Sequence, residues 1–378
     1  MSETAYVAKT MVAPRTAPVP TTGIFGFVRT RLLNSPTNIL LTIACILLLW
    51  FTIIPTVRFL LIDAVWQGSD RNACLPETVG RPVGACWPFI QAKLSQFVYG
   101  FYPEAERWRV DLTFLIGALL LLPLLIPRLP AKTINAALFF LAFPSLAFFL
   151  LHGGYGGLIV VPTHLWGGML VTLVVAITGI VASMPIGIAL ALGRRSSIPL
   201  IRIASIAFIE FWRGVPLITV LFFATYMLPL FLPGNFNVDG LVRVLIGVAL
   251  FAGAYNAEVI RGGLQAIPRG QAEAASALGL SWWKTMRLVV LPQALRHVIP
   301  GLVNSFIALL KDTSLVSIVA LFDLLGQLRA AFADPAWSSP TTLFTGFAFT
   351  GIIYFVLCFG MSRYSLFVEH RLNAHRRS

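Results

Sequence analysis

Long stretches of apolar residues, separated by short polar segments, run along most of the chain. Each stretch is close to or longer than the roughly 20 residues that an α-helix needs to cross a hydrocarbon core of about 30 Å. Because the stretches are continuously apolar and do not alternate, they predict helices and not the strands of a membrane barrel. The predicted spans cover residues 38–62, 111–130, 133–151, 165–191, 203–232, 241–260, 298–325 and 342–362.

This pattern predicts an all-α polytopic membrane protein with about eight transmembrane helices. The composition agrees, because 57% of the residues are hydrophobic and only 11% are charged, whereas soluble domains carry roughly 25% charged residues. Stretches that contain polar residues interrupt two of the spans: EFWRGVP (210–216) interrupts the fifth and KDTS (311–314) interrupts the seventh. No small-residue cleavage site follows the first apolar run, so we expect a retained helix and not a signal peptide.

The positions of the basic residues explain the net charge of +13 better than nucleic-acid binding does. Lys and Arg cluster in short segments between the spans, as in cytoplasmic loops of membrane proteins, and aromatic-basic repeats that could stack on bases are absent. The long polar segment 63–111 instead balances acidic and basic residues, which favours the outer side. Eight spans then place both termini in the cytoplasm, with a disordered tail over 1–36 and a basic tail over 371–378.

The four cysteines divide between membrane and loop positions. Cys45 and Cys358 fall inside apolar spans, where we expect small core residues. Cys74 and Cys86 both lie in the predicted outer loop, where an oxidising compartment permits a disulfide, although their spacing alone leaves the bridge open. The five histidines are scattered and no CxxC pair is present, so we expect no metal site.

One polar, alanine-rich segment, GQAEAASALGLSWWKTMRLVVLPQA at 270–294, separates two predicted spans. Surrounding Lys and Arg residues predict a cytoplasmic position. Residues 271–278 are strong helix formers, Gly279 is a suitable C-terminal stop, and Glu273 lies near the positive end of the helix dipole. The small side chains of Ala272, Ala274, Ala275 and Ala277 would let another surface approach closely. The alternative is an ordinary amphipathic helix lying on the membrane.

The order Glu273-Ala274-Ala275, Gly279 and Leu291-Pro292 resembles the EAA loop of the membrane subunits of ATP-binding-cassette (ABC) importers. Three further segments, 210–223, 257–279 and 305–321, are similar to the polar amino-acid permeases of that family. In that family the loop docks on a cytoplasmic ATPase. The resemblance implies that Glu273, Ala274, Ala275, Gly279, Leu291 and Pro292 couple this chain to an ATPase.

The resemblance covers about residues 162–367 and implies a domain organisation. The last five spans would form a type I ABC importer permease core over 162–370, with the cytoplasmic coupling loop at 262–297. The segment 37–161, with three spans and the long periplasmic loop 63–111, departs from minimal five-span permeases. It resembles the larger permease subunits of general L-amino-acid importers, and the role of its three extra helices is left open.

The resemblance also implies a function and a set of partners. The chain would be a transmembrane permease subunit of an ATP-driven importer of polar or general L-amino acids, in a bacterial inner membrane. Its partners would be two ABC ATPase subunits, a second permease that is homologous or identical, a periplasmic amino-acid-binding protein and the lipid bilayer, and no nucleic acid. Because the chain lacks a GxxxxGK[ST] phosphate loop, we expect no enzymatic activity and no bound cofactor, with ATP-Mg on the partner ATPase.

Placing an ionisable residue at membrane depth costs about 2.5 to 3.5 kcal/mol on insertion scales. We therefore expect each such residue to have an ion-pair partner or a functional role. Lys311, Asp312, Thr313 and Ser314 interrupt the seventh span, where polar groups are tolerated only if they line a cavity or are buried in protein. They are candidates for the substrate pathway, with internal pairing as the alternative. The other candidates are Glu210, Arg213, Glu258, Arg261 and Asp323.

Two pairs among these charges have a spacing of three residues, which lets them meet on one helix face. Glu258 and Arg261 are therefore expected to pair where the sixth span leaves the membrane. Glu210 and Arg213 are also expected to form a structural pair, and they are weaker candidates for the substrate pathway.

Two other classes of protein fit part of the pattern. An ion-gradient-driven secondary amino-acid transporter would work without an ATPase and would explain eight spans with buried charge, but it usually contains inverted repeats, which are not apparent. A membrane-embedded enzyme would need catalytic residues that converge at one interface, and none do.

Overall fold

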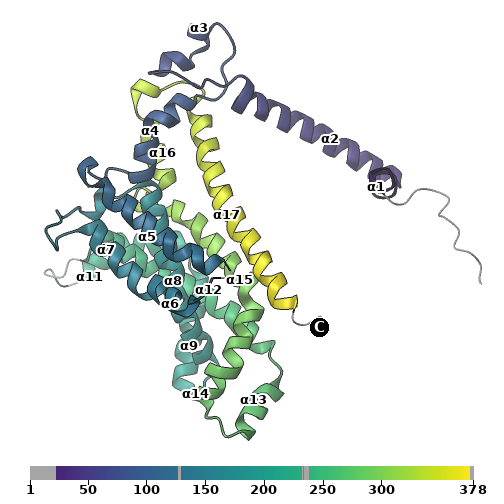
Figure 1. The fold of residues 1–378 in the computed structure, drawn as a ribbon, viewed down its shortest axis with the longest axis vertical. Coiled ribbons are helices and arrows are strands. Elements are labelled where there is room, and N and C mark those ends of the chain that lie inside the picture. The colour runs from purple at the N-terminus through teal and green to yellow at the C-terminus, as the bar shows by residue number, and fades with distance from the viewer. Residues whose placement is uncertain (1–22, 127–128, 232, 234–237, 375–378) are drawn as a thin grey trace, which may run out of the picture.

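The computed structural model describes residues 23–126, 129–231, 233 and 238–374, and Figure 1 shows their arrangement. Throughout these residues the regular structure is helical, with three isolated β-bridges and no strand. Much of the predicted disordered tail lies outside the described residues, but residues 23–32 are helical. The last helix likewise continues to Ala374, into the predicted basic tail.

Helices occupy most of the described chain, and several are continued by short π-helical or 3₁₀ turns (η). The helices of residues 23–99 are α1 (Gly23–Phe27), η1 (Val28–Leu32), α2 (Pro36–Val57), η2 (Arg58–Ile62), η3 (Arg71–Cys74), α3 (Pro76–Val79) and α4 (Trp87–Tyr99). Then come η4 (Glu104–Glu106), α5 (Arg107–Leu125), α6 (Lys132–Ala137), η5 (Leu138–Ala142), α7 (Phe143–His152), η6 (Thr163–Leu165), α8 (Gly168–Arg194) and α9 (Pro199–Gly214). The rest are α10 (Leu217–Phe222), η7 (Phe223–Met227), α11 (Leu228–Phe231), α12 (Gly240–Gln265), α13 (Arg269–Ala277), α14 (Trp282–Thr285), η8 (Met286–Val290), α15 (Leu291–Asp312), η9 (Thr313–Val319), α16 (Leu324–Ala331), η10 (Pro335–Trp337) and α17 (Thr342–Ala374).

Among the described residues, seven helices are long and apolar enough to cross a membrane, and a bent pair raises the number to eight. The prediction of about eight membrane-spanning helices is therefore confirmed. The seven continuous spans are Pro36–Ile62, Glu104–Leu125, Lys132–His152, Gly168–Arg194, Gly240–Gln265, Arg296–Val319 and Thr342–Arg371.

The break in the fifth span lies at the end of the predicted polar stretch 210–216. Helix α9 continues through Glu210 and Arg213 to Gly214, and the chain then bends by 101° into α10 and α11. The cause is Pro216, because a residue that precedes proline is driven out of the helical region. Val215 is accordingly extended, with φ −106° and ψ 134°.

The seventh span is also different from the prediction. Helix α15 begins at Leu291 and passes through Lys311 and Asp312, after which the chain tightens into the 3₁₀ turn η9. The predicted interruption at 311–314 is therefore only a change of helix type. The predicted end at residue 325 is wrong, since the span ends at Val319 and Asp323 caps the separate helix α16.

Helices α8 and α12 pack along each other and form the centre of the last five spans. Small residues permit this approach: a Cβ added at Gly253 would lie 2.5 Å from Cγ2 of Ile186, and one added at Gly187 would lie 2.9 Å from Cβ of Asn256. Such small residues are typical of helix contacts in membranes. In contrast, α2 extends away from the other spans (Figure 1), and none of its residues is buried.

The predicted outer loop 63–111 is folded and not merely polar. Cys74 and Cys86 form a disulfide with their Cα atoms 5.7 Å apart, and both are fully buried beside Phe89 and Phe97 of α4. Helix α4 packs on α8, α16 and α17. Through these contacts the segment 37–161, which we call the extension, is attached to the last five spans at the end where α16 lies. We call residues 63–102 the outer cap.

Candidate coupling loop and membrane charges

The loop between α12 and α15 projects from the helical body, and the short helix α13 lies near its tip (Figure 1). After α13 the N–H of Leu280 donates to the carbonyl of Ala275 at 3.1 Å, and the N–H of Gly279 donates to the carbonyl of Ser276 at 2.9 Å. This pair of hydrogen bonds is a Schellman motif. Gly279 has φ +76°, a conformation that glycine adopts without steric cost, so it ends the helix as predicted.

The two sides of α13 face different surroundings. Ala275 is buried, and Ala272 is half-buried against the apolar cluster that includes Met286. Glu273 and Ala274 are exposed on the other side. The predicted face of four alanines is therefore divided, because α13 uses part of it to pack on its own chain.

An exposed apolar side chain was missed at the sequence level. Leu278 is 83% exposed at the tip of the loop, directly before Gly279, and Trp283 on α14 is 73% exposed. The signal was present in the sequence, since Leu278 is the one large apolar side chain between Arg269 and Gly279. Glu273, Ala274 and Leu278 thus form the outward surface of the loop.

The loop is braced where it leaves the membrane helices. A Cβ added at Gly263 on α12 would lie 2.8 Å from the carbonyl oxygen of Ala294 on α15, so only glycine lets the two backbones come this close. Farther out, Nε2 of Gln293 donates to Oε1 of Gln271 on α13 at 3.1 Å. These contacts join α13 to α15 and α15 to α12. Of the predicted coupling residues in this region, Leu291 is half-buried and Pro292 is exposed at the start of α15.

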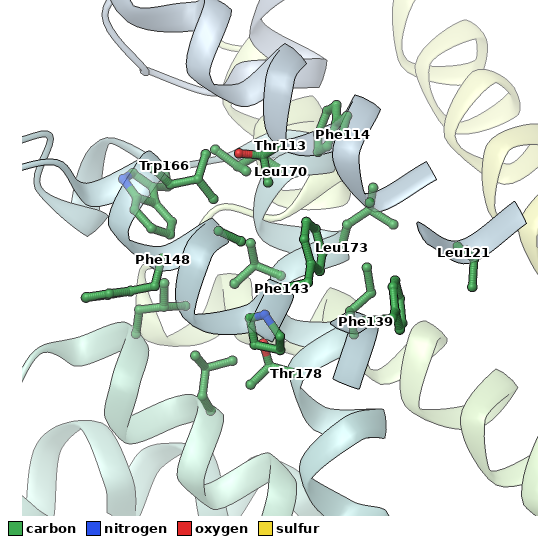
Figure 2. A pocket seen from close by; sticks show the side chains of 18 of the residues that line it. Thr113, Phe114, Leu121, Phe139, Phe143, Phe148, Trp166, Leu170, Leu173 and Thr178 are labelled. Atoms are coloured by element: carbon green, nitrogen blue, oxygen red, sulfur yellow. The ribbon is translucent and has the colours of Figure 1, made fainter. Parts of the chain in front are cut away.

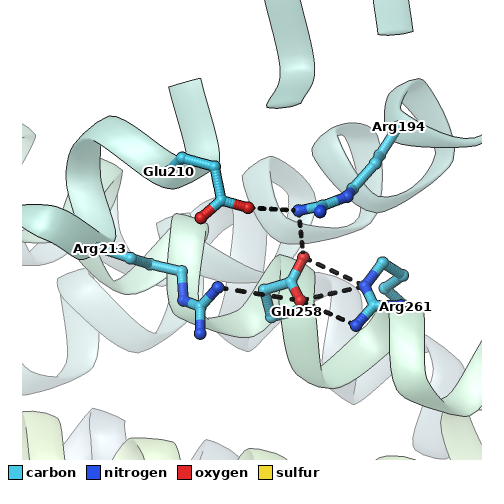
Figure 3. Close-up of polar contacts among 5 residues, drawn as sticks. All are labelled: Arg194, Glu210, Arg213, Glu258 and Arg261. Atoms are coloured by element: carbon cyan, nitrogen blue, oxygen red, sulfur yellow. Dashed lines mark hydrogen bonds and ion pairs between the residues drawn. The ribbon is translucent and has the colours of Figure 1, made fainter. Parts of the chain in front are cut away.

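At the ends of α8, α9 and α12, five charged side chains form one network (Figure 3). Nη1 of Arg194 lies 2.7 Å from Oε1 of Glu258 and 3.0 Å from Oε1 of Glu210. Oε2 of Glu258 also lies 3.0 Å from Arg261 and 3.8 Å from Arg213. Glu258 is the centre of the network because three arginines face its carboxylate, and its side chain is only 16% exposed.

The network confirms one predicted pair and contradicts the other. Glu258 and Arg261 do pair across one turn of α12. No ion pair joins Glu210 to Arg213 among the described residues; each bonds instead to a residue on another helix. Arg213 also stacks over the ring of Tyr255, with its guanidinium carbon 5.8 Å from the ring centroid. Arg194 was not predicted, because Glu258 is 64 residues away in the chain and no local pattern connects them.

The polar residues 311–314 lie at the junction of α15 and η9. Lys311 is exposed and Asp312 is half-buried, and neither forms an ion pair with a described residue. Thr313 is buried and donates to the carbonyl of Leu310 at 2.7 Å, while Ser314 is half-buried. Internal pairing of Lys311 with Asp312, the alternative to a pathway role, is thus not found in the described part of the chain.

Asp323 has a structural role at the other end of this segment. Its Oδ1 accepts the N–H of Gly326 at 2.9 Å and its Oδ2 accepts the hydroxyl of Tyr354 at 3.0 Å. These bonds cap α16 and attach it to α17. A buried carboxylate with these donors is explained by packing alone, so we do not assign it to a substrate site.

The comparisons with known proteins agree with this architecture. The family model described as binding-protein-dependent transport system inner membrane component matches residues 183–374, just over half of the chain. The chain belongs to this family. It is a permease subunit of the ABC type, as the resemblance of its EAA loop indicated.

Relatives extend this similarity beyond the matched core. The chain is 48% identical to the inner membrane amino-acid ABC transporter permease protein YhdY of Escherichia coli K12, over 96% of this chain and 97% of YhdY. It is 39% identical to the glutamate/glutamine/aspartate/asparagine transport system permease protein BztC of Rhodobacter capsulatus, over the full length of both. The first half of this permease is therefore shared with both of these relatives.

Among solved structures, a crystal structure of an amino acid ABC transporter with histidines is similar to this permease. The two are 31% identical, and the match covers 54% of this chain and 92% of the other, with a TM-score of 0.47.

Proposed function

We propose that this permease carries polar L-amino acids, as one membrane subunit of a binding-protein-dependent importer in a bacterial inner membrane. The names of YhdY and BztC support an amino-acid substrate. The complete importer would contain two ABC ATPase subunits, a second permease and a periplasmic amino-acid-binding protein. ATP-Mg would bind only to the ATPase subunits, and the permease itself would catalyse no reaction.

The orientation follows from the distribution of charge. The coupling loop carries basic residues at its base and would lie in the cytoplasm with both termini. The disulfide-bonded outer cap would lie in the periplasm, where disulfides persist. In this orientation ATP-driven closure of the ATPase pair would move α13, and the braces at Gly263 and Gln293 would carry the movement to α12 and α15.

The outward surface of the coupling loop carries this proposal. Glu273, Ala274 and Leu278 are exposed on a short helix that is fixed at both ends, and an exposed apolar side chain on a helix suits docking into a partner groove. The alternative of an amphipathic helix on the membrane would direct the apolar side to lipid. That side of α13 instead packs on its own chain through Ala275.

The test is to extract the permease from its membrane in mild detergent and to identify the proteins that co-purify. We expect an ATPase with a phosphate loop, and we expect Glu273→Lys or Leu278→Asp to remove it while the permease stays at its normal level. Glu369→Lys on α17 makes the same charge change away from the loop and should leave the ATPase bound. An ATPase that stays bound to both loop variants would contradict the docking site. Uptake that is insensitive to ATP depletion would instead favour an ion-gradient-driven transporter.

Lys311 is the best-placed residue of the proposed substrate pathway. Its ammonium group is exposed on the surface of the chain, beside the half-buried Asp312, and such a charge at membrane depth requires a polar surrounding. A pathway at the interface with the second permease would supply one, and the substrate carboxylate would pair with Lys311. We expect Lys311→Met to abolish uptake at a normal membrane level and Lys311→Arg to retain part of it. Normal uptake by Lys311→Met would remove Lys311 from the pathway.

A further inference from the structure

A cavity of about 390 Å³ lies between the extension and the last five spans. Figure 2 shows side chains from α5, η5, α7, α8 and α12 directed toward it. On α8 its wall extends from Leu170 to Thr178, which corresponds to about 12 Å at 1.5 Å per residue. Trp166 forms one end, near the start of α8, while Leu121 and Phe139 extend the lining toward the opposite end of α5 and the start of the span Lys132–His152, so the cavity reaches across the middle of the membrane.

The lining of the cavity is almost entirely hydrocarbon. No ionisable side chain contributes to it, and the few polar groups are mostly satisfied within the protein. The hydroxyl of Thr113 donates to the carbonyl of Arg109 at 2.8 Å, and the indole N–H of Trp166 donates to the carbonyl of Val161 at 3.2 Å. A zwitterionic amino acid would find no charged partner here, and water would lack the two to four polar partners that it needs.

The cavity is open to the lipid-facing surface of the chain. Leu121 and Phe148, which line opposite sides of it, are 38% and 42% exposed, whereas Trp166 and Leu170 are buried. A dry void of this size is strongly unfavourable, because protein interiors are close-packed and the cost of a cavity rises with its volume. The material that surrounds the opening in a membrane is the acyl chain of a phospholipid.

We propose that this cavity is a binding site for one acyl chain of a phospholipid. The chain would enter past Leu121 and extend toward Trp166. It would fill the contact between α5 and α7 of the extension and α8 and α12 of the permease core. The three extra helices would thus be joined to the core partly through a bound lipid.

The test uses the complete transporter, purified in mild detergent and measured by native mass spectrometry. We expect a phospholipid adduct that persists through detergent washing. The double variant Ala118→Phe, Ala147→Phe fills the cavity and should lower the adduct by about tenfold. The matched control Ala44→Phe, Ala137→Phe adds the same rings at exposed positions outside the cavity and should retain it.

A second measurement needs no variant, so it holds even if the filled cavity impairs folding. The transporter is reconstituted in vesicles of phosphatidylethanolamine and phosphatidylglycerol that contain a phosphatidylethanolamine with a diazirine in one acyl chain. After photolysis we expect adducts on Phe143 and Leu173, which line the cavity. Labelling confined to lipid-facing helices such as α2, or an adduct that survives the filled variant, would overturn the proposal. A free fatty acid in place of the phospholipid would also overturn it.

Discussion

Arg194, the last residue of α8, places its Nη1 2.7 Å from Oε1 of Glu258 on α12. Because three arginines converge on the half-buried carboxylate of Glu258, its removal leaves several cations without compensation. Breaking a fully buried pair costs about 3 to 5 kcal/mol, and the partial exposure of this network makes the cost here smaller. We expect Glu258→Gln to lower the thermal stability of the permease strongly and to abolish uptake, as measured by a thermal-shift assay in detergent and by transport in vesicles.

Glu210 provides the matched comparison, because it also bonds to Arg194 but is 54% exposed. An exposed ion pair contributes about 0 to 1 kcal/mol, so Glu210→Gln should be nearly neutral for stability. An equal loss of thermal stability in Glu258→Gln and Glu210→Gln would show that burial does not determine how much each carboxylate contributes.

Local sequence patterns predicted much of the architecture. Most of the wrong or missing predictions concern contacts between segments that are far apart in the sequence. The spans and the helix end at Gly279 were predictable because both depend on residues that are close together in the sequence. Arg194 was missed because only its fold brings it to Glu258, and the local spacing suggested the wrong partner for Glu210. Likewise the polar composition of 63–111 did not reveal a folded cap, since its core depends on α16 and α17.

The left-handed conformation of Gly279 predicts a graded effect of substitutions at the end of α13. A Cβ there meets no atom within 4 Å, so the cost comes only from φ +76°, and it amounts to about 1 to 2 kcal/mol for alanine. Asparagine tolerates this conformation better. We expect Gly279→Ala to weaken ATPase co-purification and Gly279→Asn to weaken it less. If valine were tolerated as well as asparagine, the geometry of this turn would not matter for docking.

The outer cap should depend on its disulfide. The bridge between Cys74 and Cys86 closes a loop with a sequence separation of 12, and a loop of similar length is stabilised by about 3 kcal/mol. We expect Cys74→Ser, Cys86→Ser to increase proteolysis of residues 63–102 while leaving α12 and α15 intact. Cys45→Ser, at an exposed cysteine on α2, should change nothing. Limited proteolysis of vesicles compares the three proteins, and an equally resistant cap in all of them would contradict this assignment.

The attachment of the outer cap to the segment after α16 should weaken in acid. Nζ of Lys93 on α4 lies 2.6 Å from Oδ2 of Asp334, and this bond, with the N–H of Ala336, lowers the pKa of Asp334 below its usual value. A depressed pKa contributes stability that is present above the unfolded value of about 3.9 and is lost as the pH falls through the folded value. We expect amide exchange in α4, corrected for its intrinsic pH dependence, to rise below about pH 4. Lys93→Met should raise it already at neutral pH and flatten the response, whereas an unchanged pH profile in Lys93→Met would show that another group titrates.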